Sequence, residues 1–157
     1  MASLPKQQEA HTHLHIYNMY LSIMIAAFAA VSDVRSRKIR NRFMFICLIV
    51  AILYRSILFI EKRNKFVIVD GLIGFSIPFI FFLVPYIIHC IGAADIKLMC
   101  ILGMIVGAYR ILDVIAVTIL LAGIYCIWLV MYGTKSKTIP FAAPIFAASI
   151  IVTIFYL

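Results

Sequence analysis

The sequence is dominated by long runs of apolar residues separated by short charged segments. The runs cover residues 16–32, 43–60 and 66–88, then a longer stretch over 96–132, and finally 139–157. A helix rises about 1.5 Å per residue, so about 20 apolar residues cross the hydrocarbon core of a bilayer. These runs therefore predict a chain that crosses a membrane several times as helices.

The composition excludes an ordinary soluble domain. Hydrophobic residues make up 66% of the 157 residues and charged residues only 13%, whereas a soluble domain carries about 25% charged residues. Soluble packing cannot bury so much apolar surface. We predict an all-α, polytopic membrane protein, a bundle of about six transmembrane helices, with a polar N-terminal tail over 1–15 and one membrane domain over 16–157.

The apolar stretch 96–132 is too long for one span and predicts a hairpin. Arg110 and Asp113 follow Gly107 and mark the expected turn, which gives helices over about 95–108 and 112–132. Gly103 and Gly107 form a small-x-x-x-small pair that suits close helix packing. The resulting six spans place both termini on one side of the membrane.

The basic residues predict the orientation of the chain. The formal net charge is +8, and the Lys and Arg side chains lie between the apolar runs. There they contact anionic lipid headgroups, and nucleic acid is not an expected partner. The densest basic cluster follows the first run, whereas the charges of a signal peptide precede its apolar run. We expect a retained helix in the inner (plasma) membrane, with the segment 33–42 in the cytoplasm.

Two aspartates at span ends are the candidate functional residues. Asp33 ends the first run, and Asp95 lies between the third and fourth runs. An acid at such a position is solvated, paired or used in function. Because the predicted number of spans is even, both aspartates fall on the same membrane face. The alternative is that each is a solvated helix-end residue.

Two carboxyl groups that share one proton can hydrolyse an amide. The ionised group takes a proton from water, and the protonated group polarises the scissile carbonyl. Asp95 begins a helix, where the dipole favours an anion, and Asp33 ends one, where it does not. This predicts Asp33 as the protonated partner and Asp95 as the base, although Arg35 and Arg37 favour the ionised form of Asp33. The small residues before Asp95 allow an extended substrate to approach closely, or form only a flexible loop.

Three segments resemble the prepilin peptidase family. Residues 33–41 (DVRSRKIRN) are similar to its first motif, an Asp followed by basic residues and Ile-Pro-Asn, and residues 92–98 (GAADIKL) to its second, Gly-x-Gly-Asp-hydrophobic-Lys-hydrophobic. Residues 139–144 (IPFAAP) are similar to the opening of its last helix. The resemblance implies the short, single-domain enzyme of tight-adherence and type IV pilus systems. Such enzymes are intramembrane aspartyl proteases.

The resemblance also implies a substrate and a site. The substrate is a pilin-like precursor whose short basic leader is removed at the cytoplasmic membrane face. Asp33 and Asp95 match the catalytic aspartates, and the mechanism needs no cofactor or metal. We expect five further residues to support the substrate or the loops of the site: Gly92, Ala94, Lys97, Arg35 and Asn41.

The chain departs from the family pattern at three points. Ala94 replaces the second glycine, Arg40 replaces the proline, and the tetracysteine insert that accompanies methyltransferase activity is absent. Lys97 either binds a carboxyl group, of Asp33 or of the substrate, or snorkels to the interface. The alternative functions are a carrier or channel that binds ions or protons at the paired aspartates, and a pilus or secretion assembly protein.

Two further charged residues receive structural interpretations. Arg55, near the end of the second run, is expected to snorkel to the interface. Asp70, in the first turn of the third run, is expected to cap that turn or to pair with Lys65. The triad His11, His13 and His15 lies in the polar tail and has no assigned role.

Overall fold

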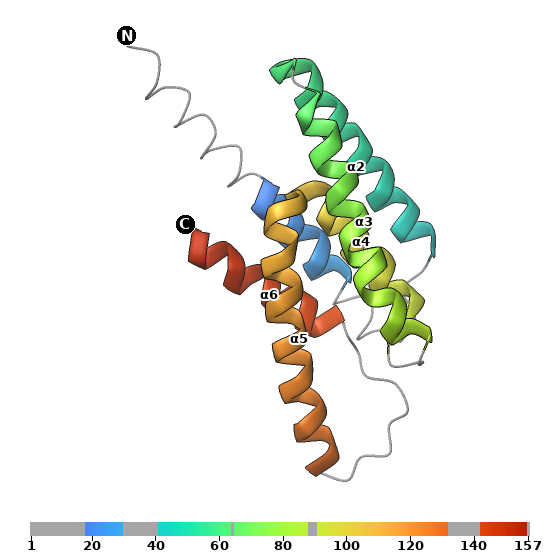
Figure 1. Ribbon diagram of the computed structural model, residues 1–157, viewed down its shortest axis with the longest axis vertical. Helices are drawn as coiled ribbons and strands as arrows, with labels where there is room; N and C mark the ends of the chain where they lie inside the picture. Colours follow the sequence, from blue (N-terminus) through green and yellow to red (C-terminus); the bar gives the residue numbers. More distant parts are fainter. Residues whose placement is uncertain (1–17, 30–40, 64, 88–90, 132–141, 157) are drawn as a thin grey trace.

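The computed structural model describes residues 18–29, 41–63, 65–87, 91–131 and 142–156, and these residues form six helices and no strand. The N-terminal helix Asn18–Ala29 is followed by five labelled helices (Figure 1). These are α2 (Asn41–Lys62), α3 (Phe66–Ile87), α4 (Ala93–Val106), α5 (Ala108–Met131) and α6 (Ala142–Tyr156). The all-α prediction is confirmed, and the predicted tail 1–15 lies outside the described residues.

The lengths and surfaces of the helices are those of a polytopic membrane protein. Among the described residues, three helices are long and apolar enough to cross a bilayer: Arg42–Ile60, Phe66–Ile87 and Ala108–Tyr125. The N-terminal helix and α6 are apolar but shorter. Large apolar side chains such as Ile60 and Ile80 lie exposed on the outer surface. Such a surface fits contact with lipid, because exposing so large an apolar area to water would be unfavourable in free energy.

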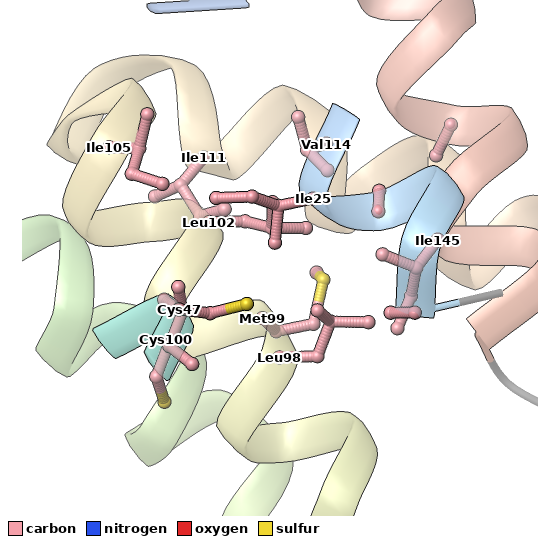
Figure 2. Close-up of a cluster of buried hydrophobic side chains, with 14 of the residues drawn as sticks. Ile25, Cys47, Leu98, Met99, Cys100, Leu102, Ile105, Ile111, Val114 and Ile145 are labelled. Atoms are coloured by element: carbon pink, nitrogen blue, oxygen red, sulfur yellow. The ribbon is translucent and has the colours of Figure 1, made fainter. Parts of the chain in front are cut away.

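The short helix α4 is the centre of the bundle. Ten of its 14 residues are buried, whereas only four of the 22 residues of α3 are buried. In Figure 2 side chains from the N-terminal helix, α2, α5 and α6 converge on those of α4, of which Leu98, Met99 and Leu102 are labelled. The other helices therefore fix α4 in position.

A glycine contact brings α3 and α4 together. A β-carbon added to Gly74 of α3 would overlap the carbonyl oxygen of Gly103 of α4, and a β-carbon on Gly103 would overlap that of Gly74. The two backbones can approach this closely only because neither residue has a side chain. The expected packing role of Gly103 is thus found, with α3 as the partner helix.

Gly107 takes part in the same contact, since a β-carbon on Gly74 would lie 2.9 Å from its carbonyl carbon, and it also ends α4. Its φ of 97° lies in the left-handed region that favours glycine. The chain then turns back, and α5 runs in the opposite direction to α4 (Figure 1). The predicted turn at Arg110 and Asp113 is wrong: both residues lie in the first two turns of α5. There Asp113 accepts a hydrogen bond of 2.7 Å from the hydroxyl of Tyr156 in α6, and Arg110 lies 5.2 Å from the centre of the same ring.

The expected snorkelling of Arg55 is also wrong, because its side chain is buried between helices. Only 6% of the residue is exposed. Its guanidinium donates to the carbonyl of Val67 at 2.9 Å and forms an ion pair with Asp70 at 3.2 Å. Asp70 therefore pairs with Arg55 instead of Lys65, and it accepts a hydrogen bond of 3.0 Å from the amide of Ala108. The buried guanidinium is tolerated because each of its three nitrogens donates to at least one acceptor.

Candidate active site

Asp95 is buried in the first turn of α4. Gly92 precedes this helix as its N-cap residue in an extended conformation, with φ −75° and ψ 145°. The amides of Asp95 and Ile96 donate to the carbonyl of Gly92 at 3.1 and 3.4 Å. Only 9% of Asp95 is exposed. The carboxyl group therefore lies at the positive end of a helix dipole and is largely shielded from solvent.

The carboxyl group of Asp95 is turned back towards Gly92. A β-carbon added to Gly92 would lie 3.2 Å from Oδ2 of Asp95, which is closer than such contacts normally are. The glycine is needed here for space and not for its backbone angles, since its φ is one that any residue adopts. The small residue before Asp95 thus leaves one side of the carboxyl group uncrowded.

Ala94 stands in the helix, where alanine is favoured over glycine. Its position is the second of α4, and its side chain packs partly buried against the hydrophobic core. A helical backbone makes no demand for glycine, and alanine loses less conformational entropy there. The departure from the second glycine of the family motif is therefore compatible with the local structure.

An apolar groove runs beside this end of α4. It has a volume of about 510 Å³ and lies between the first half of α2, the second half of α3 and the start of α4. Ala93, Ile96 and Lys97, which flank Asp95 in sequence, line it, and Lys97 is exposed. Lys97 is the charged residue of an otherwise almost wholly apolar lining. The groove is therefore suited to an apolar ligand segment that can place a negative group near Lys97.

The segment that carries Asp33 and Arg35 lies outside the described residues, but the helices on both sides of it are described. Phe28, in the last turn of the N-terminal helix, stacks on Phe43 near the start of α2, with ring centres 6.1 Å apart. Met44, the next residue of α2, lines the groove together with Ile96. Asn41 is the first residue of α2. The chain therefore leaves for Asp33, and returns from it, at the end of the bundle where α4 begins.

The described part of the site holds no cluster of metal-binding side chains. No group of three or more His, Cys, Asp or Glu residues is found among the residues that the structure describes. Cys47 and Cys100 are free thiols buried in the hydrophobic core between the helices. The charged side chains at this end of α4 in the described structure are the carboxyl group of Asp95 and the ammonium group of Lys97, and Tyr86 and Cys100 also line the groove.

The polar interactions at the other end of α4 go beyond what the sequence predicted. Arg55, Asp70 and Gly107 lie near the last turn of this helix, far along it from Asp95. A signal was present, because Arg55 is a charge inside an apolar run, and such residues are rarely placed in lipid without a partner. Like the two aspartates, this arginine is a charged residue whose position beside apolar segments indicates a partner or a function.

The fold and this site define a helical membrane protein with an acid buried at a helix start. The family model described as the type IV leader peptidase family matches residues 20–127, which is more than half of the chain, so the chain belongs to this family. The match contains both Asp33 and Asp95. No curated protein and no solved structure matches the chain. The predicted membership of the prepilin peptidases is confirmed, and the protein is a membrane-embedded peptidase of this kind.

Proposed function

We propose that the protein is an aspartyl endopeptidase that removes the short basic leader from type IV pilin-like precursors at the cytoplasmic face of the plasma membrane. One observation supports this most directly. Asp95 is buried at the start of α4, and the first residues of α2, which follow the segment with the second aspartate, line the same groove as the neighbours of Asp95. Membership of the leader peptidase family agrees with it.

Chain geometry is compatible with two cooperating aspartates. Asp33 follows the buried Ala29 by four residues, and four residues reach at most about 14 Å. Ala29 belongs to the same hydrophobic cluster as Leu98 and Met99 of α4. Asp33 is therefore tethered to the core from which Asp95 projects.

In the proposed reaction the two carboxyl groups share a proton. Asp95, at the positive end of α4, is the ionised partner that takes a proton from water. Asp33 is protonated and polarises the scissile carbonyl. After attack, a proton passes to the leaving amine and the peptide bond breaks. Arg35 and Asn41 act on the loop that carries Asp33.

The groove is the proposed binding site for the apolar segment that follows the leader in the precursor. Its three walls are apolar, and residues on both sides of Asp95 line it. A bound apolar helix would thus place its first peptide bond near the carboxyl group. Lys97 binds a carboxyl group of the substrate, and Gly92 leaves room for the extended backbone at the cleavage point.

Replacement of either aspartate tests the proposal. Asp33→Asn and Asp95→Asn each remove the shared proton, so cleavage of a precursor in proteoliposomes should fall by a factor of at least about 1,000. The matched control is Asp113→Asn, which changes a carboxyl group at the other end of the bundle and should leave the rate within about twofold. Cleavage that survives in both single variants would refute the proposal.

A carrier or channel is the weaker alternative. A proton or ion relay needs acids near the bilayer midplane, whereas Asp95 lies in the first turn of its helix. An assembly protein would not require the aspartates at all. The same three variants separate these cases from the peptidase, because only the peptidase loses precursor cleavage in both aspartate variants while insertion is retained.

A further inference from the structure

We propose that Arg55 and Asp70 are positioning residues for the peptidase, because together they hold the break between α4 and α5 and thereby set the position of Asp95. The inference depends on the proposed function of Asp95. The hydrogen bonds that the two side chains make lie around Gly107, at the end of α4 that is away from the candidate site.

The break at Gly107 leaves backbone groups without their helical partners. Gly107 still donates to the carbonyl of Gly103 at 2.9 Å, as in a helix. In an unbroken helix the amide of Ala108 would next donate to Met104, and that of Tyr109 to Ile105. The left-handed φ of Gly107 interrupts this pattern. Inside a membrane protein such unpaired groups are costly, because lipid offers no hydrogen bonds.

Arg55 and Asp70 replace the missing partners. Nε and Nη2 of Arg55 donate to the carbonyls of Met104 and Ile105 at 2.6 and 3.4 Å. Oδ1 of Asp70 accepts from the amide of Ala108 at 3.0 Å. The ion pair between Nη2 and Oδ2, at 3.2 Å, joins the two side chains. The pair thus serves both sides of the break, the end of α4 and the start of α5.

Two glycines make the room that this arrangement needs. A β-carbon on Gly107 would overlap the carboxyl group of Asp70. A β-carbon on Gly71 would lie 3.0 Å from Nε of Arg55. The backbone is therefore open at both places where the charged groups approach it, which indicates a built contact between α2, α3 and the α4–α5 break.

The contact determines where α4 lies along its axis. Asp95 precedes Met104 by nine residues in the same helix, a rise of about 14 Å. A helix of this length moves as a rigid body, so displacement of its last turn displaces Asp95 by a similar distance. The span from α4 to α5 contains no proline. Arg55 and Asp70 are thus the side chains that hydrogen-bond the backbone on the two sides of this break.

Steady-state cleavage of a precursor in proteoliposomes tests the inference. Because a misplacement of about 1 Å can reduce catalysis by about 100-fold, Arg55→Gln and Asp70→Ala should lower kcat by about 10- to 100-fold. KM should change by less than about threefold, since the groove lies at the other end of α4. Arg55→Lys and Asp70→Asn should retain more activity, because the lysine keeps the charge and the asparagine keeps the acceptor for Ala108.

Ser56→Ala is the matched control. Ser56 is the neighbour of Arg55 on α2, is exposed, and donates only to Ile52 of its own helix. Its replacement should leave kcat and KM within about twofold. A general loss from any substitution in this part of α2 would lower the activity of the control as well, and would overturn the inference.

Hydrogen exchange of the full-length protein gives a readout that does not depend on activity. We expect Arg55→Gln and Arg55→Lys to accelerate exchange at residues 104–109 and also in the first turn of α4, while α3 keeps its protection. A merely local role would accelerate exchange at 104–109 only and leave kcat unchanged, which would refute the inference. If the wild-type protein does not cleave precursor, the proposed function fails, whereas the exchange at the two ends of α4 still tests the coupling.

Discussion

At the scale of single residues, the space beside Asp95 is the feature on which the proposed chemistry depends. Gly92 contributes no side chain, and Oδ2 of Asp95 occupies the position that a β-carbon would approach. The sequence left two interpretations of the small residues open, room for an extended substrate or a flexible loop. The structure adds that a side chain at Gly92 would crowd the carboxyl group of Asp95 itself.

We therefore predict that Gly92→Ala reduces precursor cleavage by about tenfold or more, because the methyl group displaces the carboxyl group of Asp95 by a few tenths of an ångström. The measurement is kcat in proteoliposomes. Gly123→Ala is the control, since a β-carbon there meets nothing within 4 Å. It should stabilise the exposed interior of α5 by about 0.5–1 kcal/mol without changing kcat. Unchanged cleavage in Gly92→Ala would show that the space is not used.

At the scale of helices, the contact between α3 and α4 determines whether the short central helix can pack at all. At Gly74 of α3 and Gly103 of α4, the backbone of each helix occupies the space that a side chain on the other glycine would need. Such proximity gains close van der Waals contact over the whole interface, which is the main source of helix association in lipid. α4 is thus fixed laterally by glycines and axially by Arg55 and Asp70.

We expect Gly74→Ala to destabilise the protein by about 1–3 kcal/mol, because the methyl group overlaps the Gly103 carbonyl and forces the helices apart. Thermal unfolding in detergent micelles measures this. Gly123→Ala again serves as the control and should raise the melting temperature slightly. If Gly74→Ala melts at or above the wild-type temperature, the close approach of α3 and α4 is not an essential contact.

At the scale of the whole molecule, the charged segments and the helix directions define two ends of the bundle. One end holds the end of α3, the start of α4 and the start of α2, which the basic segment 33–42 leads into along the sequence. The other holds the turn between α2 and α3, in which Arg63 is exposed with a φ of 46°. Positive charge near a span end favours the cytoplasm, and the denser cluster is at the first end.

The orientation leads to a labelling prediction. In a variant whose native cysteines are replaced by serine, Arg63→Cys should react with a membrane-impermeant maleimide added to intact cells, because the α2–α3 turn faces outward in the predicted orientation. Ser136→Cys, in the polar segment after α5, should react only after the cells are opened. The reverse pattern would place the proposed site on the outer face and contradict the cytoplasmic assignment.

Most helices could be predicted from the sequence to within a few residues. The run 66–88 became α3 over Phe66–Ile87, and the run 43–60 lies within α2. The predicted boundary between α4 and α5 lies a few residues too late, because the charges of Arg110 and Asp113 are typical of a turn. In the structure Tyr156 of α6 contacts both, so charged groups are accommodated within a helix. That contact joins residues more than 40 positions apart, which no local pattern reveals.

The amino-acid sequence by itself determined the helical membrane architecture and the family, because apolar run lengths and short motifs are local properties of the chain. It also singled out Asp33, which remains a prediction, and Asp95. Only the tertiary structure decided that Arg55 is buried, that Asp70 accepts a hydrogen bond from the first residue of α5, and that Gly107 ends α4. These outcomes depend on which hydrogen-bonding groups the packing of separate helices brings within reach, and a bilayer leaves such groups no solvent as a substitute.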